Sequence, residues 1–170
     1  MHTNWSTCVV GLHSGEVMAK PSLYYGTALS PEGLPTLCRR PLGYITALTN
    51  HATLIAVGYS EGGIIVWEQC DGEEVGWRGR SMHGHSATVS CLCFVPAEPG
   101  GDAAEVRLCS GGGDNNGLVW TLHPARYGEP LHALHGHEGR IRCIEASPQV
   151  VATGSWDETV IIWSLADGAR

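Results

Sequence analysis

The stretch Val151–Trp163, with the sequence VATGSWDETVIIW, carries the pattern against which the rest of the chain can be compared. A second stretch of equal length, Leu108–Trp120 (LCSGGGDNNGLVW), has Gly, Asp and Trp at matching places. A third, Ile55–Trp67 (IAVGYSEGGIIVW), keeps the Gly and the Trp but has Glu61 at the Asp position. Repetition of this kind indicates a fold made of similar units, each of which buries its apolar face only against its neighbours.

The spacing of the repeats indicates the size of the unit. Trp67 and Trp120 are 53 residues apart, and Trp120 and Trp163 are 43 apart, at or above the roughly 40–45 residues of a four-stranded propeller blade. The excess fits an inserted loop, residues 96–105, which is rich in Pro, Gly and Asp. Short apolar runs between Gly, Asp and Asn turns, without a helical period, indicate strands throughout.

We therefore expect an all-β fold, an incomplete β-propeller of about three four-stranded blades plus a partial N-terminal blade. The expected organisation is a degenerate or partial blade and loop at 1–40, followed by blades within 41–170. The blade boundaries fall at about 44–82, 83–134 and 135–170.

Both ends of the repeat array are unusual. Cys8–Met18 is similar to the hairpin Ile55–Val66 without its Trp, and Pro21–Pro41 reads as a loop or an edge connection. The last blade has no fourth strand, and a closed propeller needs at least four blades. We expect a part of a longer propeller or of a larger assembly. Alternatively, residues around Trp5–Val10 supply the missing outer strand of the last blade.

A Gly-His pair and an alternating strand precede each of the two better repeats: Gly84-His85 and Gly136-His137. This pattern resembles WD-repeat proteins. The resemblance implies a hydrogen-bonded set in each blade, in which a histidine joins an Asp to a Ser or Thr that also meets the Trp indole. By spacing, the two sets are His85, Ser110, Asp114 and Trp120, and His137, Thr153, Asp157 and Trp163. Such buried polar groups persist because they satisfy one another.

The Ile55–Trp67 copy fails at several of these positions. Val57 stands at the Ser/Thr position and Glu61 at the Asp position, and Pro41–Tyr44 takes the place of the Gly-His pair. We interpret it as a degenerate blade.

Two chemical alternatives use the same residue types. His, Ser and Asp together are the members of a hydrolytic triad, and the two His-x-His elements, which begin at His83 and His135, are typical of metal ligands. Because the histidine and the Asp recur blade by blade, we interpret the sets as structural and expect no catalytic residue, metal or cofactor. The seven cysteines are odd in number and form no Cys-x-x-Cys pair. We expect them to be reduced and buried, with zinc binding as the alternative.

Charge and hydropathy exclude several classes of partner. The net charge is −7 and Lys20 is the only lysine, so nucleic acid and anionic membranes are disfavoured. No apolar stretch reaches the roughly 18–20 residues of a membrane span, and no secretory signal is evident. We expect a cytoplasmic protein, with the nucleus as a second location.

Residues 81–165 resemble one WD-repeat family in particular, the phospholipase A-2-activating protein family. The segments that carry the resemblance are Gly84–Cys93, Gly111–Asn115, Glu129–His137 and Gly154–Thr159. The resemblance implies a role in ubiquitin-dependent turnover, with ubiquitin as a partner and an AAA ATPase segregase as a second partner. The alternative is a signalling or trafficking adaptor without affinity for ubiquitin.

Propeller scaffolds bind partners at the face that carries the loops between blades and the turns between second and third strands. The residues predicted for this face are Ser86, Thr88, Gly113, Glu138, Arg140 and Trp156. Trp156 is the strongest candidate because Trp and Arg dominate interface hot spots. The alternative is that Trp156 packs against the neighbouring blade.

Overall fold

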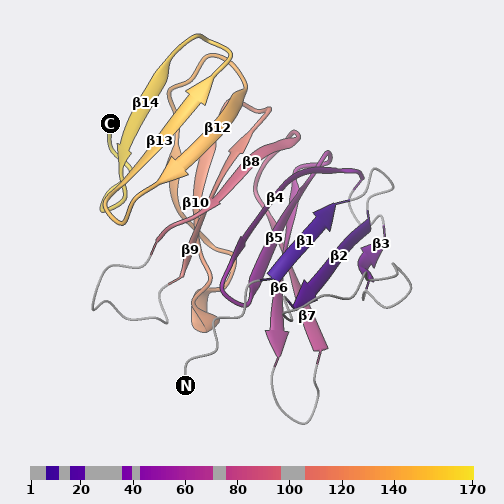
Figure 1. Cartoon of the computed structure of the whole chain (residues 1–170). Helices are drawn as coiled ribbons and strands as arrows, with labels where there is room; N and C mark the ends of the chain where they lie inside the picture. The colour runs from indigo at the N-terminus through magenta and orange to yellow at the C-terminus, as the bar shows by residue number, and fades with distance from the viewer. Residues whose placement is uncertain (1–6, 12–15, 22–35, 40–42, 71–75, 97–105) are drawn as a thin grey trace.

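The computed structural model describes residues 7–11, 16–21, 36–39, 43–70, 76–96 and 106–170. Within these ranges the chain forms antiparallel sheets that stand side by side in an open arc (Figure 1). The N-terminal sheet contains β1 (Thr7–Gly11), β2 (Glu16–Pro21) and β3 (Thr36–Arg39). The predicted fold class, an incomplete all-β propeller, is confirmed.

Three further sheets follow in chain order, and we call them the first, second and third blades. The first blade contains β4 (Ile45–His51), β5 (Leu54–Tyr59), β6 (Gly63–Cys70) and β7 (Gly76–His83). The second contains β8 (Val89–Phe94), β9 (Arg107–Gly112), β10 (Gly117–Thr121) and β11 (Pro130–Leu134). The third contains β12 (Ile141–Ala146), β13 (Val150–Ser155) and β14 (Val160–Ser164). In each blade the strands pair in chain order, so every turn joins neighbours.

The N-terminal region corrects two expectations. β1 pairs with β2 along Thr7–Gly11, so this segment does not supply the outer strand of the third blade, and that alternative is wrong for the described residues. The segment Pro21–Pro41 is not only a connection, because Thr36–Arg39 forms β3 at the edge of the same sheet. The inserted loop predicted at 96–105 lies outside the described residues from 97 onward.

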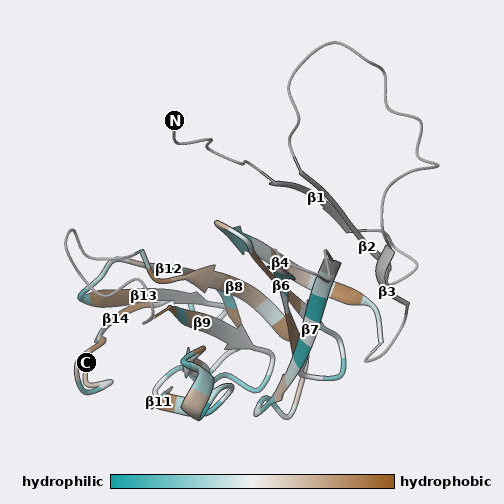
Figure 2. Ribbon diagram, turned by 90° about the horizontal axis from the view of Figure 1, so that it is seen from below, coloured by the Kyte–Doolittle hydropathy of each residue, from teal (hydrophilic) through white to brown (hydrophobic). Residues whose placement is uncertain are grey.

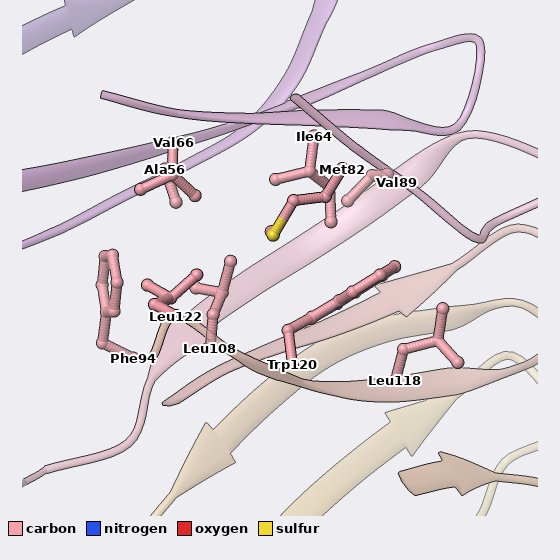
Figure 3. Close-up of a cluster of buried hydrophobic side chains, with 10 residues drawn as sticks. All are labelled: Ala56, Ile64, Val66, Met82, Val89, Phe94, Leu108, Leu118, Trp120 and Leu122. Atoms are coloured by element: carbon pink, nitrogen blue, oxygen red, sulfur yellow. The ribbon is translucent and has the colours of Figure 1, made fainter. Parts of the chain in front are cut away.

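The hydrophobic core lies between blades rather than within one sheet. Figure 3 shows the cluster between the first and second blades, in which Trp120 and Leu108 from the second blade face Ile64 and Met82 from the first. Another cluster, around Val119, Leu134 and Trp163, fills the space between the second and third blades. Each fully buried Leu, Val or Ile side chain contributes about 1.5–3 kcal/mol, so each blade depends on its neighbour for stability.

A glycine in the second strand of the first and second blades sets how closely the next blade can approach. A Cβ at Gly58 would lie 2.6 Å from Val89 Cγ1 on β8, and one at Gly111 would lie 2.5 Å from Ile141 Cγ2 on β12. Only glycine leaves this space. The glycine of the first two repeats is therefore a packing requirement against the first strand of the next blade, whereas a Cβ at Gly154 would meet Cys143 Sγ of its own blade at 2.6 Å.

The later strands of the blades differ in how far neighbouring strands and blades cover their side chains. β7 is hydrophilic over much of its length (Figure 2). In the second blade Val119 is fully buried, whereas its counterpart in the third blade, Ile162, is 53% exposed on β14. In the described ranges of the chain, β14 is the last strand of its sheet and its one paired neighbour is β13. In the described part of the chain, no helix is long and apolar enough to cross a membrane.

Candidate functional site: the loop face of the second and third blades

In the second blade four side chains from three segments meet in one hydrogen-bonded set. His85, in the loop before β8, places Nδ1 3.0 Å from both Asp114 carboxylate oxygens and Nε2 2.8 Å from Ser110 Oγ. The indole Nε1 of Trp120 donates to the same Ser110 oxygen over 2.8 Å. The set ties β9 and β10 to the loop that precedes β8.

The third blade repeats this geometry. His137 places Nδ1 2.8 Å from Asp157 Oδ2 and Nε2 2.8 Å from Thr153 Oγ1. Trp163 Nε1 donates to Thr153 Oγ1 over 2.7 Å. In both blades the structure brings all four residues of the set together, and we call each set a tetrad.

The direction of the hydrogen bonds follows from the donors. The indole N–H of Trp120 can only donate, so the Ser110 hydroxyl accepts from it and donates to His85 Nε2. His85 then carries its proton on Nδ1 and donates to Asp114 as a neutral imidazole. Burial lowers the pKa of His85, and the Asp114 carboxylate opposes only part of that effect. The neutral form that the tetrad needs is thus the form that burial favours.

The tetrads have the connectivity of a hydrolytic triad but not its accessibility. Ser110 and Thr153, which occupy the place of a nucleophile, are both fully buried. Each hydroxyl already accepts from a tryptophan indole. A nucleophile must reach a substrate carbonyl, and neither of these oxygens can do so. The geometry therefore supports a structural role.

The acidic member of each tetrad also organises the adjacent turns. Asp157 accepts from the backbone N–H groups of Glu138 and Thr159, each at 2.9 Å, and from the Thr159 hydroxyl. These bonds, that of Thr159 foremost, together with the one from His137, hold the pKa of Asp157 well below its usual range. Asp114 accepts from the N–H groups of Ser86 and Asn116 in the same way. The tetrads thus fix the loops that form the predicted binding face.

The first blade lacks this set. Val57, at the Ser/Thr position, is fully buried. Trp67 Nε1 is buried and has no hydrogen-bond partner. An unsatisfied buried N–H costs about 1–3 kcal/mol, so the substitution of Val for Ser or Thr leaves a defect in this blade.

The structure bears on the predictions for metal ions and for the cysteines. Among the described residues there is no group of three or more His, Cys, Asp or Glu side chains that could hold a metal ion. His135, one of the histidines outside the tetrads, has Nδ1 2.7 Å from Asn116 Oδ1.

Cys91, Cys93, Cys109 and Cys143 are free thiols. Burial raises the pKa of Cys109 to about 12, but Cys143 is exposed, so the expectation of burial is wrong for it.

Trp156 lies on the surface beside two arginines. It is 65% exposed, so it does not pack into the neighbouring blade. The guanidinium carbon of Arg140 lies 5.1 Å from the Trp156 ring centroid, and that of Arg142 lies 5.5 Å from it. Both are within the range of a cation–π contact. A Cβ on Gly113 would lie 3.1 Å from Arg140 Nε, so glycine at 113 leaves room for this side chain.

The other predicted face residues differ in what their side chains do. Ser86 and Glu138 are exposed, and each gives its backbone N–H to a tetrad Asp. Thr88 is half-buried, and its hydroxyl donates to the Ser60 carbonyl over 3.1 Å. Thr88 thus joins the first and second blades rather than presenting a free hydroxyl.

Comparison with known families agrees with this geometry. A family model described as WD domain, G-beta repeat, matches residues 76–121 and 128–164, which contain both tetrads. These two segments of the chain are WD repeats. Proteins built of WD repeats are interaction scaffolds, and the loop face described above is where this one presents an exposed aromatic and two cations.

Several relatives match about half of the chain. It is 33% identical over 94 residues to Elongator complex protein 2 of Mus musculus and 32% identical over 83 residues to phospholipase A-2-activating protein of Xenopus laevis. It is 33% identical over 100 residues to protein transport protein sec13 of Neurospora crassa. The aligned segments span 48–49% of this chain but only 11%, 10% and 33% of these relatives. The similarity is therefore of comparable strength across WD-repeat proteins of different names.

A solved structure supports the fold over nearly the whole chain. The crystal structure of the computationally designed Ika4 protein superimposes with a TM-score of 0.70 and 20% identity, and the match covers 96% of this chain and 87% of that one. At this identity the likeness concerns the fold alone.

Two residues of the WD-repeat face are not identified by the repeat pattern. Thr159 is bonded to Asp157 of the third-blade tetrad, and an Asp-x-Thr turn is the sequence signal that could have found it. Arg142 lies beside Trp156 because it occupies a β-bulge, where the register between β12 and β13 shifts between Ile141 and Cys143. A bulge redirects side chains, and no repeat signature marks this one.

Proposed function

We propose that this WD-repeat protein is a non-catalytic scaffold that binds ubiquitin through the loop face around Trp156. The observation that carries the proposal is the exposure of Trp156 at 65% beside Arg140 and Arg142. Trp and Arg are among the residues most enriched at interface hot spots, and here one Trp and two Arg side chains lie together on the surface.

Rigid support of this face is a second argument. Interface loops that are already ordered lose little entropy on binding. Asp157 fixes the backbone at Glu138, in the loop before β12, and at Thr159, in the turn that contains Trp156. Asn115 Nδ2 donates to the Glu138 carbonyl over 3.2 Å, which ties the second blade to the third at the same place.

The choice of ubiquitin as the partner rests on the resemblance of residues 81–165 to the phospholipase A-2-activating protein family, of which one member is 32% identical over 83 residues. That role places the protein in the cytoplasm, with the nucleus as a second location. Binding of an AAA ATPase segregase follows from the resemblance alone.

Titration of the ¹⁵N-labelled chain with unlabelled ubiquitin tests the proposal. We expect shifts in the Trp156 indole resonance and in the backbone amides of Glu138 and Arg140. Trp156→Ala should weaken binding by at least about tenfold, the size of a hot spot. Tyr44→Ala is the matched control, because Tyr44 is also 65% exposed but belongs to the first blade.

The second candidate function is an adaptor in protein transport, favoured by the similarity to protein transport protein sec13, 33% of whose length is matched. A ubiquitin titration without shifts near Trp156 and Arg140 would rule out the first candidate and favour the second. Elemental analysis of the purified protein addresses the enzyme alternative. A stoichiometric metal lost on replacement of His83 and His135 would contradict a purely structural role for these elements.

A further inference from the structure

The three blades share one backbone contact at the loop face, and it shows what the fold requires there. The donor is the residue before the tetrad Asp in the second and third blades, and the residue before Glu61 in the first. In each blade its backbone N–H donates to a carbonyl in the loop that precedes the first strand. The bonds run from Ser60 N to Tyr44 O (3.0 Å), from Gly113 N to Thr88 O (2.7 Å) and from Trp156 N to Arg140 O (3.0 Å). Because the contact uses only main-chain atoms, the fold does not require Trp156 or Arg140 as side chains.

The β-bulge in the first strand of each blade (β4, β8 and β12) also shows that the fold does not require an arginine at this position. It holds Thr46 in the first blade, Ser90 in the second and Arg142 in the third. The Thr46 hydroxyl donates to the Val89 carbonyl over 2.6 Å and so joins the first two blades. Arg142 makes no such contact and is exposed. The third blade alone combines an aromatic and two arginines at these positions, which we call the Arg–Trp cluster (Arg140, Arg142 and Trp156).

The charges of the Arg–Trp cluster are not neutralised within the described part of the chain. Neither Arg140 nor Arg142 forms an ion pair there; the ion pairs found involve His85, Arg126 and His137. The carboxylate of the third-blade tetrad, Asp157, is committed to His137, Glu138 and Thr159. Two guanidinium groups held over an indole, on a chain of net charge −7, form a local cationic site on an acidic protein.

We propose that the Arg–Trp cluster binds an acidic peptide segment in which two carboxylates contact the two guanidinium groups. This inference deepens the proposed function, since it rests on the loop face being a protein-binding surface, but it does not require the partner to be ubiquitin. Arg is suited to carboxylates because its planar fork can donate two parallel hydrogen bonds. Glutamates at positions i and i+2 of an extended segment lie about 7 Å apart on one face, which suits two neighbouring cations.

A peptide fits the site better than a nucleic acid does. Nucleic-acid binding draws its affinity from many phosphate contacts, and the chain has one lysine and nine arginines spread along its length. Two cations provide local charge complementarity, which gives specificity and encounter rate for a short acidic segment.

Fluorescence anisotropy with the full chain and a labelled, capped peptide, Gly-Glu-Ala-Glu-Ala-Glu-Gly, tests the inference. The matched probe replaces each Glu with Gln, and a third replaces the central Glu with phosphoserine. We expect the Glu peptide to bind at least about tenfold tighter than the Gln peptide at low salt, with the difference shrinking as ionic strength rises. The double variant Arg140→Gln/Arg142→Gln should lose about tenfold in affinity for the Glu peptide.

Arg126→Gln is the charge-matched control. Arg126 is exposed in the 3-10 turn between β10 and β11, where it pairs with Glu129. We expect the Arg126→Gln variant to bind the Glu peptide with the same affinity as the parent chain. An unchanged melting temperature of the double variant shows that the double variant folds. Equal binding of the Glu and Gln peptides, binding of the phosphoserine peptide alone, or an unaffected double variant would each overturn the inference. A chain that binds the Glu peptide but not ubiquitin would refute the choice of ubiquitin and leave this inference standing.

Discussion

The first and third blades are built on the same strand pattern but satisfy their buried polar groups differently. In the third blade Thr153 accepts from Trp163 and contacts His137, so the indole, the hydroxyl and the imidazole are all paired. In the first blade Val57 leaves the Trp67 indole N–H without a partner. The difference shows that the strand register and the interblade core are sufficient for the blade fold. The tetrad adds order to the loops that it ties down, and of these two blades the third, which has the tetrad, presents Trp156.

The largest expected effect comes from converting the third blade to the chemistry of the first. Thr153→Val keeps the shape of the side chain but leaves the Trp163 indole N–H and His137 Nε2 unpaired in the core. We expect a loss of roughly 1–3 kcal/mol in the free energy of unfolding for each orphaned group, measured by urea denaturation. Thr49→Val, on β4 and outside any tetrad, is the control and should change little. Equal stability of the parent chain and Thr153→Val would contradict the tetrad's role.

Removal of the acidic tetrad member should have a smaller effect that is centred on the loops. Asp157→Ala removes the acceptor for His137, Glu138 and Thr159, which should lower the melting temperature and speed hydrogen exchange at the Glu138 and Thr159 amides. Glu61→Ala, at the same position of the first blade, should leave the melting temperature nearly unchanged. Similar melting shifts for both variants would remove the distinction between the blades.

Acidification should destabilise the protein in two steps. Burial lowers the pKa of His85 in the folded state, so the unfolded chain binds a proton first, and stability should fall as the pH drops below about 6.5. The pKa of Asp157 is also lowered on folding, so its contribution is present above about pH 4 and is lost below it. Melting temperatures between pH 8 and pH 3 measure both steps. His85→Gln should reduce the fall in melting temperature between pH 8 and pH 5. A parent chain that is equally stable at pH 8 and pH 5 would contradict the step assigned to His85.

The smallest expected effect is a repair of the first blade. Val57→Thr places a hydroxyl where Thr153 has one, within reach of the unpaired Trp67 indole N–H. We expect a gain of about 0.5–1 kcal/mol from the new hydrogen bond, reduced by the cost of burying a hydroxyl that has no histidine partner. Val57→Ala, which supplies no acceptor and leaves a cavity, should lower the free energy of unfolding measured by urea denaturation. A destabilising Val57→Thr would show that Trp67 gains nothing from an acceptor there.

The sequence could predict the blades because their defining residues act through fixed strand spacing. A Gly in the second strand and a Trp in the third lie at constant offsets, and the antiparallel register carries those offsets into space. His85 and His137 follow from the same regularity, since each lies four residues before its inner strand. The structure brings each of them to its Asp and hydroxyl partner.

What the sequence could not predict depends on local breaks in that regularity. Arg142 reaches Trp156 because of a bulge, and a bulge shifts side chains without leaving a composition signal. β3 forms within a proline-rich segment that reads as a loop. Cys143 lies on β12 between Arg142 and Ile144 and is exposed, because no blade follows the third among the described residues.

Hydrogen exchange of the tryptophan indole protons, followed by ¹⁵N NMR with and without ubiquitin, tests most directly the division between structural tetrads and a binding loop face. Trp120 and Trp163 should exchange slowly, because their indole protons are buried and bonded to Ser110 and Thr153. The Trp156 proton should exchange rapidly in the free protein and become protected when the partner binds. A Trp163 proton that exchanges as fast as that of Trp156, or a Trp156 proton already protected in the free protein, would contradict this division.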